Sequence, residues 1–167
     1  MKLTIYRIFS FLLLPIAVLF SIAVLLLIRA AFANTAMFIP LFLIACIAIY
    51  TFASLNFLIR GIDGKRFLGK SSKDWLKVNA IASTIFALLM ISQCIILILH
   101  PEMLQQIVAQ AKANASPGFT MNDANFQNYL RATSYFFLVY AIVLFIHIML
   151  SFQYLKQYAY LFQDKRD

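Results

Sequence analysis

Charged residues are scarce in this sequence, and four long stretches contain none. Only 12% of the 167 residues are Asp, Glu, Lys or Arg, about half the share that is usual in a soluble domain. The stretches without such residues are 8–28, 37–59, 78–99 and 134–155. About 20 helical residues, at a rise of about 1.5 Å each, cross a hydrocarbon core of about 30 Å. The sequence therefore predicts an integral membrane protein with four spans.

The same scarcity disfavours several kinds of membrane chemistry. A proton-driven carrier normally needs a carboxylate inside the membrane, and none of the four stretches contains one. The two histidines, His100 and His147, fall at different depths, so they do not share a haem iron within the bundle. Metal catalysis lacks its cluster of carboxylate, cysteine and histidine ligands. We therefore expect no cofactor and no enzymatic activity.

Cysteine and proline are also few. Cys46 and Cys94 lie far apart in the sequence, which disfavours a membrane thiol oxidoreductase with closely spaced cysteines. Pro15 falls inside the first stretch and predicts a kinked helix, either as a hinge or as a static bend. Pro40 falls in the first turn of the second stretch, where its missing N–H costs little. Because no internal repeat is present, an inverted-repeat transporter has no support.

The uneven distribution of basic residues predicts the orientation. Two precede the first stretch, six lie between the second and third, and three follow the fourth, so eleven of fourteen fall on one side. The positive-inside rule makes this side cytoplasmic. A cleaved signal peptide is the competing interpretation of the first stretch, which is longer than the about 7–15 apolar residues of a signal core.

We therefore predict an all-α fold, an integral membrane four-helix bundle that forms one transmembrane domain over residues 1–167. Its expected location is the plasma or inner membrane, with four passes and both termini in the cytoplasm.

The connection between the second and third stretches is the most polar segment. Its six basic residues oppose only Asp63 and Asp74. We expect them to contact the anionic headgroups of the bilayer at the cytoplasmic face, at roughly 1 kcal/mol per charge. A sharper alternative is a specific site for a lipid headgroup or a nucleotide, although the segment lacks the spacing of a phosphate-binding loop. The candidate contacts are Arg60, Lys65, Arg66, Lys70, Lys73 and Lys77.

The connection between the third and fourth stretches is the longest. Within residues 101–113, apolar residues recur at helical spacing and polar residues take the other face. This predicts a short outer amphipathic helix on the bundle or on the membrane surface. The segment Thr120-Met121-Asn122-Asp123 is typical of a capping box and predicts a helix that runs on into the fourth stretch. An apolar stripe on that helix would meet either the outer helix or a partner, and consists of Phe126, Tyr129 and Leu130.

One ionisable residue, His147, lies inside the apolar stretches and defines a candidate polar site. Ionisable residues are costly in a membrane and often mark proton relays, ion paths or ligand sites. Counting along the helices places His147 level with Ser83 and Thr84, with Asn56 nearer the cytoplasmic surface. The structural interpretation is a neutral His147 hydrogen-bonded to Ser83, Thr84 or a backbone carbonyl. The functional interpretation is an intramembrane site formed by all four residues.

Composition also predicts how the helices are used. The third stretch is the most polar and is expected to be the most central, whereas the first is expected to face lipid. Four aromatic residues at the inner end of the fourth stretch predict an interfacial belt and a helix that continues as a partner-facing stripe. They are Tyr154, Tyr158, Tyr160 and Phe162.

The lack of catalytic motifs favours a non-catalytic protein. The first hypothesis is an accessory or scaffold subunit that binds other membrane protein subunits through the outer stripe and the inner tail. The alternative is a small transporter, channel, or lipid- or ligand-binding protein that uses the polar region around His147. Although the net charge is +8, the basic residues lie at the ends of spans, which argues against nucleic acid as a partner.

Overall fold

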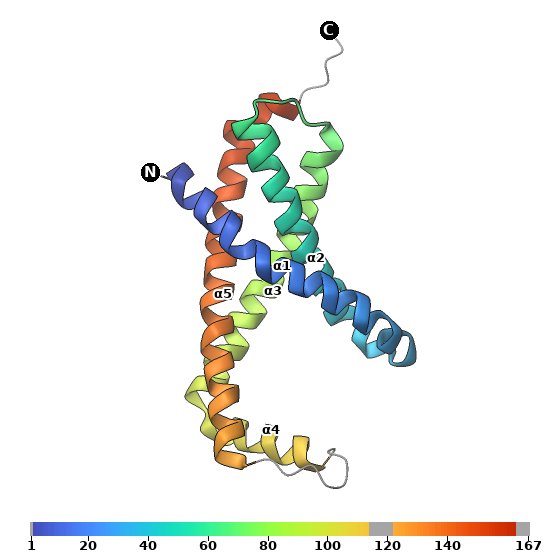
Figure 1. Cartoon of the computed structure of the whole chain (residues 1–167), viewed down its shortest axis with the longest axis vertical. Coiled ribbons are helices and arrows are strands. Elements are labelled where there is room, and N and C mark those ends of the chain that lie inside the picture. Colours follow the sequence, from blue (N-terminus) through green and yellow to red (C-terminus); the bar gives the residue numbers. More distant parts are fainter. Residues whose placement is uncertain (1, 114–121, 163–167) are drawn as a thin grey trace. The chain divides into compact units, whose positions relative to one another are not determined.

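The structure, a computed structural model, describes residues 2–113 and 122–162, and its elements in these ranges are helical (Figure 1). In chain order they are α1 (Lys2–Ala33), η1 (Thr35–Met37), α2 (Phe38–Asn56), η2 (Phe57–Asp63), α3 (Lys70–Leu99), α4 (Pro101–Ala113), α5 (Asp123–Gln157) and η3 (Ala159–Phe162). Within these described ranges, four helices are long and apolar enough to cross a membrane, and they contain the four predicted stretches. The predicted all-α class is therefore confirmed.

The chain divides into two compact units. The first combines Met1–Phe86 with Val143–Asp167, and so contains α1, α2, η2, η3, the first half of α3 and the last half of α5. The second is Ala87–Ile142, which contains α4 and the remaining parts of α3 and α5.

Buried positions in the first unit recur every three or four residues along each helix. Ser10, Leu13 and Ala17 mark this face of α1, and Leu144 and Ile148 belong to the corresponding face of α5. This spacing places the side chains on one side of each helix. In membrane proteins such faces associate through close packing and hydrogen bonds between helices.

The degree of burial corrects one expectation about the bundle. We compare the share of buried residues in the most apolar part of each span. This share is 11% for Leu3–Ala33, in agreement with the expectation that the first span is the one most exposed to lipid. However, Lys70–Leu99 reaches only 17%, against 28% for Thr35–Asp63 and 33% for Asp123–Gln157. The prediction that the third span is the most central is therefore wrong. Three of its polar side chains, those of Asn79, Thr84 and Ser92, do not require a central position, because they bond to carbonyls of their own helix.

The chain reverses direction tightly between α2 and α3. The reversal consists of η2 and of residues 64–69, and we call residues 64–69 the linker. The backbone of Lys65 is left-handed, with φ of 48°. A Cβ atom on Gly64 would lie 2.8 Å from the carbonyl oxygen of Arg60, so this turn needs a glycine. Farther along, the N–H of Leu68 donates to the carbonyl of Leu161 at 2.7 Å. The linker and η3 thus lie side by side at one end of the first unit (Figure 1).

The inner tail does not continue as an exposed helix. The helix α5 ends at Gln157 and the chain turns into η3. Tyr154 and Phe162 are buried, whereas Tyr160 is 52% exposed. The predicted partner-facing stripe is therefore wrong, because Phe162 packs against Phe57 of η2, with 5.5 Å between ring centroids.

The second unit confirms a short amphipathic helix between the third and fourth predicted spans. The bounds of α4, Pro101–Ala113, match the prediction, and its buried residues Leu104 and Val108 belong to the predicted apolar face. The side-chain oxygen of Asn122 accepts from the N–H groups of Ala124 and Asn125 and so caps α5. The predicted cap, Thr120, lies outside the described residues.

Candidate functional site

His147 is the centre of a buried polar cluster in the first unit. Its ring atom Nε2 lies 2.9 Å from Oγ of Ser10, and Nδ1 lies 2.8 Å from the Tyr50 hydroxyl oxygen. The Tyr50 hydroxyl also lies 2.8 Å from Oγ of Ser151, which is 3.2 Å from the Tyr6 hydroxyl. All five side chains are fully buried. We call Tyr6, Ser10, Tyr50, His147 and Ser151 the His147 cluster, and it joins α1, α2 and α5.

Helix periodicity and ring packing hold this arrangement. Tyr6 and Ser10 are four residues apart on α1, as are His147 and Ser151 on α5, so each pair lies on one helix face. The Tyr6 ring stacks on His147, with centroids 4.7 Å apart and planes inclined by 5°. The Tyr50 ring meets the imidazole at 72°, with a centroid distance of 5.7 Å. These contacts fix the orientation of the imidazole.

The hydrogen bonds specify which ring nitrogen of His147 carries hydrogen. The hydroxyl of Ser10 donates to the carbonyl of Tyr6 at 2.8 Å. A serine hydroxyl has one hydrogen, so Nε2 of His147 must donate to Ser10. In a neutral imidazole, Nδ1 then carries no hydrogen, and it lies 2.8 Å from the Tyr50 hydroxyl oxygen, which lies at the same distance from Oγ of Ser151. The assignment follows from the bonding pattern.

This pattern has a chemical consequence for the Ser10–His147 pair. A serine beside a histidine resembles a nucleophile and its base, but a base must accept the serine hydrogen. Here Nε2 donates to Ser10, whose own hydrogen is directed to Tyr6. Both side chains are also fully buried. The pair therefore acts in this arrangement as a connection between α1 and α5.

The structure separates the four residues of the predicted polar site. Thr84 donates to the carbonyl of Ala80 in its own helix, and Asn56 lines a groove described below. Ser83 is fully buried, and its hydroxyl has no hydrogen-bond partner among the described residues. The expectation that His147 bonds to Ser83 or Thr84 is corrected, because Ser10 and Tyr50 take that place. A functional role of the predicted site stays a prediction.

Sequence reasoning missed four members of the His147 cluster: Tyr6, Ser10, Tyr50 and Ser151. Two signals were present, namely the Tyr6/Ser10 and His147/Ser151 pairs, each with a spacing of four within apolar stretches. Counting depth along the helices ranks residues by level, but it does not say which helices are neighbours.

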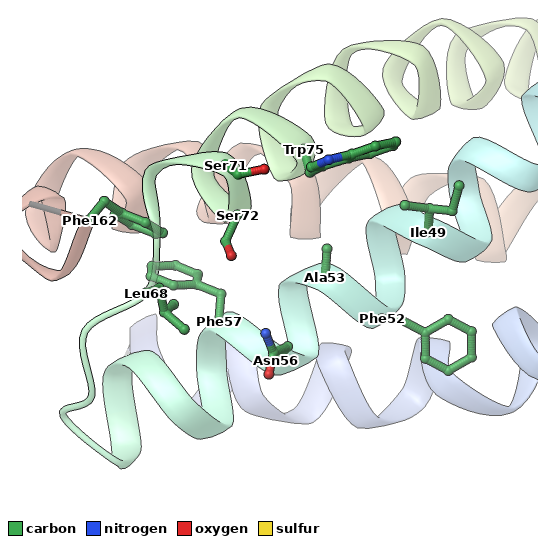
Figure 2. A pocket seen from close by; sticks show the side chains of 10 residues that line it. All are labelled: Ile49, Phe52, Ala53, Asn56, Phe57, Leu68, Ser71, Ser72, Trp75 and Phe162. Carbon is green, nitrogen blue, oxygen red and sulfur yellow. The ribbon is translucent and has the colours of Figure 1, made fainter. Parts of the chain in front are cut away.

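A second candidate site lies at the linker end of the first unit, and we call it the linker groove. It has a volume of about 450 Å³, and Figure 2 shows Trp75 of α3 facing Ala53 of α2 across it. Apolar side chains form most of its wall, and Asn56, Ser71 and Ser72 add polar groups. Its lining residues are Ile49, Phe52, Ala53, Asn56, Phe57, Leu68, Ser71, Ser72, Trp75 and Phe162.

Basic residues outnumber acidic ones in the sequence segment that contributes Leu68, Ser71, Ser72 and Trp75 to the linker groove. Asp63 is already paired with Arg7 at 2.5 Å, which leaves Asp74 as the remaining acidic residue of this segment. The ammonium group of Lys73 lies 5.8 Å from the centre of the Phe162 ring. Among the described residues, no ion pair involves the six predicted headgroup contacts, which are Arg60, Lys65, Arg66, Lys70, Lys73 and Lys77.

Other features relevant to function are few in residues 2–113 and 122–162. No group of three or more His, Cys, Asp or Glu side chains in these ranges is arranged to hold a metal ion. Cys46 and Cys94 are buried free thiols. Comparison of the chain with models of protein families, with curated proteins and with solved structures finds no match.

Proposed function

We propose that this chain is a four-span, non-catalytic membrane protein that serves as an accessory or scaffold subunit of a larger membrane complex. The linker and both ends of the chain lie on the cytoplasmic side, because eleven of the fourteen basic residues belong to that side. The partner is another membrane protein whose helices pack against the outer half of α3.

The observation that carries this proposal is the position of Gln93. Its side chain is exposed although it lies six residues inside the end of α3 at Leu99, which is about 9 Å along the helix. Leu89 and Ile96, one turn away on either side, are exposed apolar side chains. Lipid tails offer no hydrogen bond to an amide, whereas a neighbouring helix can.

The neighbouring serine provides a comparison. Ser92 is also exposed, but its hydroxyl donates to the carbonyl of Leu89 at 2.8 Å. No described residue bonds to the side chain of Gln93. A glutamine in this position gains about 0.6–2 kcal/mol from a hydrogen bond to a partner helix in the membrane. Gln93 therefore favours helix pairing over direct contact with lipid.

The test is native affinity purification in mild detergent, followed by mass spectrometry of the proteins that copurify. We expect a stoichiometric membrane partner with the wild type and a reduced yield of it with Gln93→Leu. Gln153→Leu is the matched control, because Gln153 is also exposed but lies near the end of α5. A wild-type protein that purifies alone contradicts the accessory role, and an unchanged yield with Gln93→Leu contradicts the assigned surface.

The transport alternative requires a polar cavity beside His147. The polar atoms of His147 are bonded to Ser10 and Tyr50, and all three side chains are fully buried. This arrangement supports a structural connection between helices more than a path for a solute. The lipid-binding alternative has support at a different place, which is the linker groove.

A further inference from the structure

We propose that the linker groove binds one anionic diacyl phospholipid, with its headgroup at the first turn of α3 and an acyl chain along the apolar wall. The inference requires insertion in a membrane but not the pairing of α3 with a partner. It can therefore hold or fail separately from the accessory role.

The shape and lining of the groove suit an acyl chain. Its volume of about 450 Å³ lies within the range of about 300–1,000 Å³ that is typical of ligand sites. Ile49, Phe52 and Ala53 of α2 form an apolar wall opposite Trp75 (Figure 2). Trp75 is the one tryptophan of the sequence and is 59% exposed. Tryptophan is enriched at the level of lipid headgroups, so the open side of the groove faces the lipid at that level.

A second depression adjoins the first. It is also about 450 Å³ in volume and is lined by Lys70, Ser71, Asp74, Trp75 and Val78. Ser71 and Trp75 belong to both depressions. Trp75 and Ser71 therefore stand between two neighbouring depressions, which matches a ligand with one headgroup and two chains.

The polar end of the groove favours an anion. Ser71 and Ser72 lie in the first turn of α3, and Figure 2 shows Ser72 pointing from α3 towards α2. Helix N-termini attract phosphate through their backbone N–H groups and dipole. Lys70 begins the same turn, and the ammonium group of Lys73 lies over Phe162 at the edge of the groove.

The balance of charge in this segment supports the same ligand. Arg7 neutralises Asp63, so the six basic residues between Arg60 and Lys77 face a single remaining carboxylate, that of Asp74. Basic residues attract anionic lipid at roughly 1 kcal/mol each near a membrane surface. Neutral lipids have no net charge to match this surplus. The groove therefore selects an anionic phospholipid over a zwitterionic one.

The groove is formed by distant parts of the chain. Its floor includes Leu68 and Phe162, and the Leu68 N–H donates to the carbonyl of Leu161. A Cβ atom on Gly61 would lie 3.0 Å from Leu68 Cδ1, which shows how closely η2 approaches the floor. These contacts keep the floor in place without a ligand.

Trp75 provides the assay, since it is the only tryptophan and lies at the site. The full chain is reconstituted in vesicles of dioleoylphosphatidylcholine that contain increasing fractions of either brominated phosphatidylglycerol or brominated phosphatidylcholine. Bromine quenches indole fluorescence at short range, so the two titrations give the relative affinity for the two headgroups. We expect a preference for phosphatidylglycerol of roughly five- to thirtyfold, the equivalent of about 1–2 kcal/mol from one or two lysines. Equal quenching by both lipids overturns the proposal.

Charge variants separate a specific site from general surface attraction. We expect Lys70→Gln and Lys73→Gln each to lower the preference by about fivefold, which corresponds to about 1 kcal/mol. Lys156→Gln is the control, because it removes an exposed lysine from the same side of the membrane but outside the groove. An equal loss of preference with Lys156→Gln indicates general attraction and overturns the site.

A steric variant tests the acyl chain. Ala53 lines the groove and Ala45 lies on the same helix outside it. We expect Ala53→Phe to abolish the preference for phosphatidylglycerol and Ala45→Phe to preserve it. A preference that survives Ala53→Phe places the lipid elsewhere on the surface and overturns the groove. If either variant fails to fold, the wild-type titration still decides the proposal.

Discussion

Replacing His147 by leucine tests whether the His147 cluster stabilises the protein. Leucine fills the fully buried position with an apolar side chain and so removes both ring nitrogens. The change breaks the bonds to Ser10 and Tyr50 and the stacked contact with Tyr6. Ser10 keeps its bond to the carbonyl of Tyr6, so it retains one polar partner.

The expected cost follows from these contacts. A hydrogen bond between helices in a membrane contributes about 0.6 kcal/mol on average and up to about 1.7 kcal/mol. A stacked pair of rings adds about 0.5–1.5 kcal/mol. Two hydrogen bonds and one stacked contact therefore predict a loss of about 2–5 kcal/mol in the free energy of unfolding.

The assay is reversible unfolding of the purified protein, by titrating sodium dodecyl sulfate into mixed micelles and following the circular dichroism. A double-mutant cycle with Tyr50→Phe isolates the bond between Tyr50 and Nδ1 of His147. We expect a coupling energy of about 0.6–1.7 kcal/mol. Thr84→Val is the control, because the Thr84 hydroxyl bonds only to Ala80 of its own helix.

The outcome can refute the structural reasoning in two ways. A His147→Leu variant as stable as the wild type shows that the polar contacts add nothing to the association of α1, α2 and α5. A coupling energy near zero shows that Tyr50 and His147 do not interact in the folded protein. Either result would favour the functional interpretation, in which His147 is an unpartnered polar group of an intramembrane site.

Two further predictions concern the ends of the helices. Backbone N–H bonding at the start of α4 and the contact with His100 lower the pKa of the Glu102 carboxyl, so His100→Ala raises this pKa in an NMR titration. The stability that the carboxylate contributes is present at neutral pH and is lost as the pH falls through its lowered pKa. Gly64→Ala forces the carbonyl of Arg60 to move and lowers the free energy of unfolding by about 1–3 kcal/mol. Gly69→Ala is the control and has a small effect in the same assay, because the added Cβ atom meets no atom within 4 Å.

The helices were predictable because their cause is local. A long apolar stretch specifies a helix wherever it lies, and the spacing of Leu104 and Val108 specifies the buried face of α4. The contacts between helices were not predictable in the same way. Counting along the helices placed His147 and Ser83 at similar levels, but His147 contacts Ser10 of α1 and Tyr50 of α2. Level alone does not determine the direction in which a side chain points.

The linker groove illustrates the same limit. Its basic residues were predicted as headgroup contacts from their position between two spans. Its floor was not, because it depends on the return of η3 to the linker through Leu161 and on the close approach of η2 at Gly61. Phe162 was expected in an exposed stripe and instead forms part of the floor. Contacts between residues distant in the sequence decide such features.

The bond between Ser10 and His147 also sets the order of events during synthesis. The two residues are 137 positions apart, so a ribosome adding about 5–20 residues per second needs roughly 7–27 s to pass from one to the other. For most of this interval, from the addition of Ala33 onwards, α1 has been made but its last partner helix, α5, has not. In the proposed membrane topology, the first helix therefore stays in the bilayer by its own mean hydropathy, which at 3.1 is the highest among the four candidate spans of the described residues. Its leucine-rich composition thus serves the nascent chain before it serves the folded protein.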